Sequence, residues 1–426
     1  MDLFGSDSDD ETIVNSSAII QSIIPRIRNY IDRLIKQTCH DLNQLHQEPL
    51  STELAESFVQ FQNQLDVTCE SLARRGCEAA LCNLKSKGKW EHVCWRELFV
   101  ISKLILVGIE LRKNDFETAV LEADYAFILG APKEETNLVF RLVAPILEGS
   151  RASTETGQLL GLQEVHELVA TQWNDAVLSQ LVPLPSSTSI KVFPGFLNSE
   201  ELELFRVENV PCVMTNGAGS WAAMNKWRDL NYWKTMFGNR IVPVELGGGA
   251  TDSIANWKEE MMPLEQFIDS LGGSSVAYLA QHPIFDQIMG LNKDIVTPLF
   301  CTHNGRQLKS RSIWMGTAST VTPLHFDSFD NFLVQVAGLK LAVLFAATET
   351  PNLYTIESST EIATASQGNI SSIDVASPDY SAFPKYRDAV GQLVLLKPGD
   401  VLFMPRGTWH YMRSLTPSLS TNFWFE

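Results

Sequence analysis

The stretch Thr322-Pro-Leu-His325-Phe-Asp327 and the later Trp409-His410-Tyr411 decide how this chain is interpreted. Alternate residues of a β-strand point to the same face, so His325 and Asp327 leave one strand on the same side. His410 lies far along the chain, and a closed barrel would bring its strand alongside the first. The spacing therefore predicts two facing strands in a β-barrel with these three side chains turned inward.

Short apolar runs on both sides of these motifs predict the remaining strands. They are rich in β-branched, aromatic and other apolar residues and are separated by turn signals such as Lys397-Pro-Gly-Asp400. The runs are residues 313–316, 332–336, 393–396, 401–405 and 418–425. An all-β catalytic half is expected.

Two imidazoles and one carboxylate on one face of a metal ion form the ligand set of non-haem Fe(II) oxygenases, which keep the remaining positions open. A His-x-Asp tripeptide alone occurs in many unrelated chains. Here the strand context favours a metal site, and we predict His325, Asp327 and His410 as its catalytic metal ligands.

Lys340 follows shortly after the first two ligands, just past Gly338. Enzymes with this ligand set usually bind a dicarboxylate, whose distal end needs a buried cation. A buried ion pair is costly unless its other hydrogen bonds are satisfied, so Thr322 and Tyr278 are expected as hydroxyl partners. The alternative for Lys340 is an exposed residue in a β-turn.

Longer motifs make the interpretation specific. The C-terminal half resembles the JmjC (jumonji-C) oxygenases, and within them the jumonji-domain-containing-5 group, also called lysine demethylase 8. The resemblance covers roughly residues 190–426, and more loosely the N-terminal half. It is carried by residues 211–214, 240–245, 278–287, 323–327, 331–336, 409–411 and 423–424.

This resemblance implies an α+β chain whose C-terminal part is a double-stranded β-helix, the cupin-like JmjC barrel. It implies Fe(II) bound by the three ligands, with 2-oxoglutarate and O₂ as co-substrates. The family's pocket for the distal carboxylate of 2-oxoglutarate matches Lys340, Tyr278 and Thr322, and the amide beside the co-substrate matches Asn331.

In the arginyl-hydroxylase part of this group, an acidic residue and aromatic walls hold the substrate side chain. The matching positions are Glu245, Gln281, Trp314 and Trp424. A carboxylate pairs with a guanidinium through two hydrogen bonds, and indole faces stack on its plane. The resemblance therefore implies hydroxylation of arginine side chains in protein substrates.

Two alternatives stay open at this point. The same site could demethylate N-methyl-lysine in histones, since hydroxylation of an N-methyl carbon gives an unstable hemiaminal. The second alternative is a cupin-like interaction module without catalysis, against which the intact triad and Lys340 argue. A carboxylate with two acceptor oxygens suits a guanidinium better than an ammonium.

The rest of the chain divides by composition and periodicity. Residues 1–12 predict a disordered acidic tail and residues 13–182 an all-α N-terminal domain, with isoleucines at three- and four-residue steps from Ile20 to Ile31. Residues 183–195 are expected to be a linker and residues 196–426 the catalytic domain. The helical domain is a possible site of homodimerisation.

Charge and composition limit the partners. The net charge of −17 argues against direct nucleic-acid binding and favours a basic protein substrate. No apolar run reaches the length of a membrane span. The odd count of seven scattered cysteines is typical of reduced thiols, so a nuclear and/or cytoplasmic location is expected.

Overall fold

The computed structural model describes the chain in two compact units, residues 1–150 and 151–426. The described residues are 21–31, 67–86, 93–131, 133–151, 173, 175–247, 258–356 and 367–426. The predicted acidic tail, residues 1–12, lies outside them. Each unit is considered by itself.

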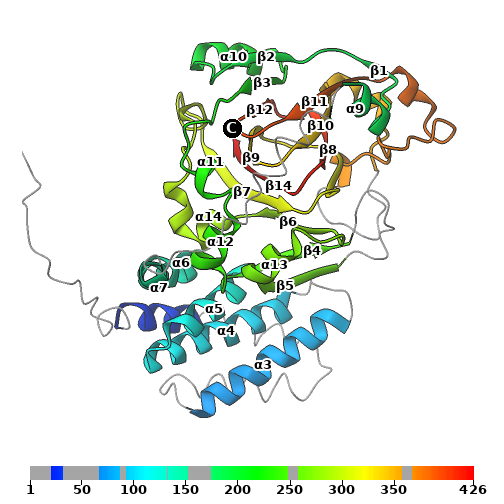
Figure 1. The fold of residues 1–426 in the computed structure, drawn as a ribbon. Helices are drawn as coiled ribbons and strands as arrows, with labels where there is room; N and C mark the ends of the chain where they lie inside the picture. Colours follow the sequence, from blue (N-terminus) through cyan, green and yellow to red (C-terminus); the bar gives the residue numbers. More distant parts are fainter. Residues whose placement is uncertain are drawn as a thin grey trace, which may run out of the picture. The chain divides into compact units, whose positions relative to one another are not determined.

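The first unit is helical, as the periodicity predicts (Figure 1). Residues 21–31 form a helix whose isoleucines at 23, 24, 27 and 31 are buried. The later helices are α3 (Val67–Ser86), α4 (Val93–Lys113), α5 (Phe116–Ile128), α6 (Lys133–Leu142) and α7 (Ala144–Arg151). Asp115 ends the short turn between α4 and α5 and caps α5, because its side chain accepts a hydrogen bond from the Thr118 amide at 3.0 Å.

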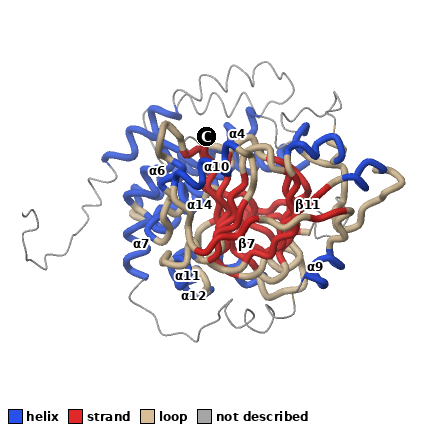
Figure 2. The backbone as a smooth tube through the Cα atoms, turned by 90° about the horizontal axis from the view of Figure 1, so that it is seen from above, coloured by secondary structure: helices blue, strands red, loops and turns tan. Residues whose placement is uncertain are grey.

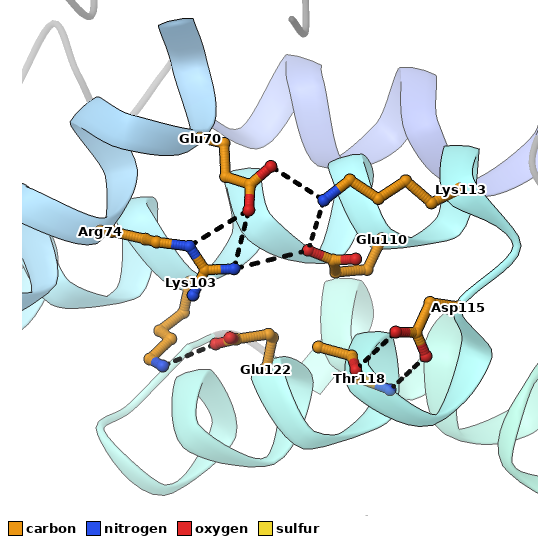
Figure 3. Close-up of polar contacts among 8 residues, drawn as sticks. All are labelled: Glu70, Arg74, Lys103, Glu110, Lys113, Asp115, Thr118 and Glu122. Atoms are coloured by element: carbon orange, nitrogen blue, oxygen red, sulfur yellow. Dashed lines mark hydrogen bonds and ion pairs between the residues drawn. The ribbon is translucent and has the colours of Figure 1, made fainter. Parts of the chain in front are cut away.

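Charged side chains tie these helices together (Figure 3). Glu70 of α3 accepts hydrogen bonds from Arg74 at 2.8 Å and from Lys113 of α4, also at 2.8 Å. Lys103 of α4 pairs with Glu122 of α5 at 2.6 Å, and both side chains are largely buried. The Glu70 pair is exposed and contributes little to stability. The partly buried Lys103 pair fixes which faces of α4 and α5 meet.

The second unit contains two mostly antiparallel sheets (Figures 1 and 2). One has the order β1-β11-β10-β13-β8 and the other β2-β3-β12-β9-β14-β7-β6-β4-β5. The strands of the five-stranded sheet are β1 (Ser186–Ser187), β8 (Val321–Phe326), β10 (Lys340–Phe345), β11 (Val390–Leu396) and β13 (Trp409–Ser414). Those of the nine-stranded sheet are β2 (Lys191–Pro194), β3 (Cys212–Thr215), β4 (Ile241–Leu246), β5 (Lys258–Pro263), β6 (Ala277–His282), β7 (Leu308–Gly316), β9 (Asp330–Ala337), β12 (Val401–Met404) and β14 (Ser418–Phe425).

Side-chain alternation separates a core face from a cavity face in the large sheet. Four phenylalanine rings from β9, β12, β14 and the short helix η3 (Leu299–Cys301) pack together, with ring centres 5.1 to 6.5 Å apart. These rings are Phe300, Phe332, Phe403 and Phe425. On each strand, the residues next to these phenylalanines point to the opposite face and line the space between the two sheets. Because successive side chains of a strand point to opposite faces, this alternation places the cavity residues together on one face of the sheet.

Short helices cover the outer side of this unit. They are α9 (Asp175–Leu181), α10 (Ser199–Val207), α11 (Ala223–Lys226), α12 (Leu230–Phe237), α13 (Leu264–Ser270) and α14 (Ile284–Gln287). Trp227 and Trp233 are fully buried among them, 5.4 Å apart. In the described part of the chain, no helix is long and apolar enough to cross a membrane.

Gly338 makes the turn by which the chain passes from β9 of the nine-stranded sheet to β10 of the five-stranded sheet. Its φ is +75°, and a Cβ atom there would lie 2.1 Å from the Pro417 carbonyl oxygen. Only glycine suits such a conformation and approach. The turn places Lys340 at the first position of β10, buried inside the unit.

The fold prediction is confirmed in its main features: a helical N-terminal region precedes a β domain of two mostly antiparallel sheets. The predicted domain limits remain predictions. Helix α9 packs its Leu178 into the core that contains Leu341 of β10. Residues of the expected linker pair with the sheets, since β1 lies beside β11 and β2 beside β3.

Candidate metal centre and co-substrate cavity

The sheet register brings the three predicted metal ligands together. His410 of β13 lies directly opposite His325 of β8, and Asp327 comes just after the end of β8. One ligand atom from each residue lies within 4.8 Å of the others. The Asp327 carboxylate is 3.8 Å from Nε2 of both histidines. In the described part of the chain, this is the one cluster of such groups that could hold a metal ion.

Backbone carbonyls fix both imidazole rings. Nδ1 of His325 lies 2.8 Å from the Pro323 carbonyl oxygen, and Nδ1 of His410 lies 3.0 Å from that of Thr408. A carbonyl oxygen can only accept, so Nδ1 carries the proton in both rings. The neutral ring then has its lone pair on Nε2, the nitrogen that faces Asp327. This is the tautomer that a metal site requires.

Burial keeps the inner histidine neutral. His410 is 5% exposed. Burial is the main cause that lowers its pKa to about 4, and the charge of the neighbouring His325 is the second. At neutral pH its Nε2 is therefore free of a proton and able to bind a metal. The donor set of two neutral nitrogens and one carboxylate fits Fe(II).

Trp424 holds the carboxylate. Its indole Nε1 donates a hydrogen bond to Oδ2 of Asp327 at 2.9 Å. Sequence reasoning assigned Trp424 to the substrate wall, and the structure adds this contact with the metal ligand. Groups that orient ligands in this way contribute to metal affinity.

Replacing Trp424 with phenylalanine should weaken metal binding roughly 10- to 100-fold, the usual effect of losing a group that orients a ligand. The ring would still fill the wall, but Asp327 would lose its donor. Calorimetric titration with Co(II) measures the effect. Trp314→Phe is the matched control, because the Trp314 indole donates to Asn422 and not to a metal ligand. Equal affinities of Trp424→Phe and wild type would contradict this role.

The triad lines a cavity of about 230 Å³ between the two sheets. All but one of the predicted site residues line this cavity. Its lining residues are Tyr278, Gln281, Trp314, Thr322, His325, Asp327, Asn331, Leu333, Lys340, Asn369, Met404, His410, Met412, Asn422 and Trp424. One cavity therefore joins the metal ligands with the predicted co-substrate residues.

Lys340 lines the same cavity at some distance from the metal ligands. In the β10–β13 ladder, Leu344 pairs with the ligand His410, whereas Lys340 pairs with Ser414, four residues further along. Lys340 is 2% exposed, and burial lowers its pKa to about 7. In the described residues no carboxylate pairs with this ammonium group. A buried lysine in a cavity without an acidic partner fits an anionic ligand, as a dicarboxylate co-substrate would require.

Tyr278 and Thr322 stand beside this end of the cavity. Burial raises the pKa of the Tyr278 hydroxyl, while a hydrogen bond with Thr322 opposes the rise. Tyr278 is therefore neutral at physiological pH and can donate its hydroxyl proton to an acceptor. Both hydroxyls match the partners expected for a carboxylate at Lys340.

The predicted substrate residues lie around the cavity, with one exception. Trp314 and Trp424 line it, and Gln281 is turned towards it by an irregularity in β6, where the pairing with β7 shifts between Leu279 and His282. Gln281 has a positive φ of 50°, as such irregularities near sites often produce. Glu245 does not line the cavity; it lies on β4 opposite Tyr278 and Glu259.

Several lining residues were not predicted. Asn422 accepts a hydrogen bond from the Trp314 indole at 3.0 Å and donates to Asn331 at 3.4 Å. Its spacing of two from Trp424 was a signal that could have found it. Asn369 donates to the Phe326 carbonyl oxygen at 2.8 Å, but it belongs to an irregular segment that gives no periodic signal. Leu333, Met404 and Met412 supply apolar lining.

Comparison with known proteins gives the family of the chain. Residues 198–426 match the model of the cupin-like domain family. The chain is 31% identical to JmjC domain-containing protein F of Dictyostelium discoideum, over 94% of this chain and 97% of that protein. It is 30% identical to Lysine-specific demethylase JMJ30 of Arabidopsis thaliana over 80% and 82%, and 38% identical to Lysine-specific demethylase 8 of Xenopus tropicalis over 58% and 55% of the two chains.

These matches confirm the predicted family and enzyme class. Members of the family generally depend on Fe(II) and 2-oxoglutarate, and the residues of the triad are present here in one cluster. The chain belongs to the JmjC family of cupin-like proteins, and it is a 2-oxoglutarate-dependent oxygenase or demethylase.

Proposed function

We propose that this protein is an Fe(II)- and 2-oxoglutarate-dependent oxygenase that hydroxylates arginine side chains of protein substrates. The observation that carries the oxygenase part is one cavity lined by both the triad and the unpaired Lys340. His325, Asp327 and His410 would hold the metal. When bound, Fe(II) supplies the redox chemistry by which O₂ and 2-oxoglutarate oxidise a C–H bond.

The chain's own groups place the co-substrate. The Lys340 ammonium pairs with the distal carboxylate of 2-oxoglutarate, and the Tyr278 and Thr322 hydroxyls supply further hydrogen bonds. Asn331 is held by Asn422, which donates to its Oδ1, so the Nδ2 group of Asn331 is left as a donor. A donor beside the metal ligands suits the carboxylate at the keto-acid end. Burial of these groups strengthens each contact.

The aromatic walls support a planar cationic substrate. Trp314 and Trp424 border the cavity near the triad and can stack on a guanidinium. Gln281 offers an amide at the exposed mouth. Glu245 lies one strand beyond Tyr278, close enough for its charge to act on the Tyr278 hydroxyl. We assign Glu245 to the guanidinium as it enters the mouth of the cavity.

N-methyl-lysine demethylation is the second candidate, because two of the similar proteins are named lysine-specific demethylases. The two reactions share the metal and the co-substrate and differ in the substrate carbon. Hydroxylation of a side-chain carbon gives a stable alcohol, whereas hydroxylation of an N-methyl group releases formaldehyde. The substrate pocket alone decides between them.

Glu245→Gln should lower kcat/KM for an arginine peptide about 10- to 150-fold, since losing a hydrogen bond to a charged group costs roughly 1.5–3 kcal/mol. The amide keeps the size of the side chain but loses the charge and the second acceptor that guanidinium prefers. Decarboxylation of 2-oxoglutarate without substrate should persist. Mass spectrometry of the peptide and succinate assays measure the two quantities.

Glu260→Gln is the matched control, because Glu260 lies on the neighbouring strand β5 and is exposed. Arginine and methyl-lysine peptides are compared side by side with all three proteins. Strong formaldehyde release from methyl-lysine peptides that is unaffected by Glu245→Gln would overturn the arginine proposal in favour of demethylation. Absence of succinate under every condition would overturn the oxygenase proposal itself.

The remaining expectations belong to the same proposal. A basic protein or peptide substrate suits the net charge of −17, and no direct binding of nucleic acid or membrane is expected. A nuclear and/or cytoplasmic location and a homodimer through the helical domain remain predictions.

A further inference from the structure

The turn before β13 determines where the third metal ligand lies. Residues 405–408 connect β12 to β13, with Gly407 at a φ of +81°. The Thr408 amide donates to the Pro405 carbonyl oxygen at 3.1 Å, which closes the turn. The Thr408 carbonyl oxygen in turn accepts from Nδ1 of His410. The turn therefore fixes the carbonyl oxygen that orients the His410 ring.

Two consecutive amides of this turn are held by the segment that carries the other ligands. The Gly407 amide donates to the backbone carbonyl oxygen of Asp327 at 2.9 Å. The Arg406 amide donates to Oδ1 of the Asp330 side chain at 2.8 Å. The acceptor of the Gly407 amide is a backbone atom of a metal ligand. The acceptor of the Arg406 amide is the side chain of Asp330, which a substitution can remove.

Asp330 is a buried carboxylate at the start of β9. It is 3% exposed, and burial raises the pKa of its carboxyl group. Its other oxygen faces Arg206 of α10 only at 3.7 Å. A buried carboxylate costs stability unless hydrogen bonds and opposite charges compensate, and here the Arg406 amide and the charges of Arg206, Arg406 and Arg306 oppose the effect of burial. The acid supplies a fixed acceptor to the turn.

We propose that Asp330 is a positioning residue for the metal centre: its carboxylate fixes the turn that orients His410 relative to Asp327. The inference rests on the proposed metal site, because it concerns how the third ligand of that site is held. Asp330 does not touch the metal or the substrate. It acts through Arg406, Gly407 and the Thr408 carbonyl group.

The same contacts are compatible with a purely structural role, and Asp400 provides the comparison that separates the two. Asp400 is also buried, at 7% exposure, and burial also raises its pKa. It also accepts from backbone amides, those of Lys397 at 2.9 Å and Asn216 at 3.1 Å. It lies in the turn between β11 and β12, at the other end of β12 from the turn that precedes His410.

The experiment uses the full chain and Co(II) alone as the probe. Metal affinity is measured by calorimetric titration and stability by urea denaturation, for wild type, Asp330→Leu, Asp330→Asn and Asp400→Leu. We expect Asp330→Leu to bind Co(II) about 10- to 100-fold more weakly, the usual effect of losing a group that orients ligands. Asp330→Asn retains an acceptor for the Arg406 amide and should stay within a few-fold of wild type. Asp400→Leu should lose stability but bind Co(II) as wild type does.

Each outcome decides the question. Equal Co(II) affinities of Asp330→Leu and Asp400→Leu would overturn the inference, whether both fall or both stay unchanged. If Asp330→Leu does not fold, Asp330→Ser replaces it, because serine is too short to reach the Arg406 amide and adds no apolar bulk. A wild-type protein that does not bind Co(II) would instead refute the proposed metal site and with it the proposed function.

Discussion

Asp327→Ala is expected to abolish turnover, with succinate production falling to the background of a reaction without enzyme. Asp327 is the anionic member of the triad, and without it two neutral imidazoles remain to hold a divalent cation. The two sheets should still form, because the side chain is at the edge of the cavity and outside the apolar core. Succinate assays, Co(II) titration and thermal melting measure the three effects.

Two further variants locate the cause of this loss. Asp327→Asn keeps an acceptor for the Trp424 indole but loses the charge, so it should fail in catalysis while melting close to wild type. Asp388→Ala removes an exposed carboxylate far along the chain and should change nothing. Near-normal succinate production by Asp327→Ala would show that the metal is bound elsewhere.

Lys340→Met is expected to have the second large effect. Without the ammonium group, the distal carboxylate of 2-oxoglutarate would enter the cavity unpaired. Removing one partner of a buried ion pair costs roughly 3–5 kcal/mol, which corresponds to about a 10²- to 4 × 10³-fold weaker apparent affinity. Co(II) affinity should stay almost unchanged, since Lys340 is not a ligand. Titration of 2-oxoglutarate against succinate formation separates the two quantities.

The same variant should be more stable than wild type when no co-substrate is present. Burial lowers the pKa of Lys340 to about 7 from an ordinary value of 10.5, so the unfolded chain binds more protons between these values. Wild-type stability therefore rises with pH across this window, and the cost of the buried charge is fully present below pH 7. The advantage of Lys340→Met should be largest at low pH and shrink towards pH 10.

The lowered pKa also predicts how 2-oxoglutarate binding depends on pH. Above about pH 7 the empty site holds a neutral amine, so binding of the dicarboxylate must take up a proton and weakens as the pH rises. Lys385→Met, which removes an exposed lysine, should keep this dependence. A Lys340→Met protein with a normal 2-oxoglutarate titration would show that the cavity binds the co-substrate without this cation.

The clustering of His325, Asp327 and His410 and the burial of Lys340 could be predicted from the sequence because strand geometry is simple. A His-x-Asp spacing places two side chains on one face, and the short turn at Gly338 returns the chain so that Lys340 begins the next strand. The apolar runs at 332–336 and 418–425 lie within strands β9 and β14, as expected. These features depend on local rules that a single sequence contains.

Features that depend on the pairing of distant strands were not predictable in this way. The contact between Trp314 and Asn422 requires β7 to lie beside β14, a register that local periodicity does not specify. Asn369 reaches the cavity from a segment outside the long strands, and Ser371 in that segment is buried, with its amide donating to the Leu324 carbonyl oxygen of β8. Glu245 was assigned by resemblance, and its place outside the cavity lining appears only from the three-dimensional arrangement.

The direct opposition of His410 and His325 in the β13–β8 ladder makes the assembly of the proposed metal site depend on strand register. A slip of one residue between these strands would turn His410 to the opposite face while leaving most backbone hydrogen bonds formed. Such a misregistered protein could be compact and yet unable to bind metal. Since a ligand that binds only the native state stabilises it, a metal ion bound at the proposed site would favour the correctly paired strands over the shifted pairing. The metal content of purified protein would then measure the correctly folded fraction.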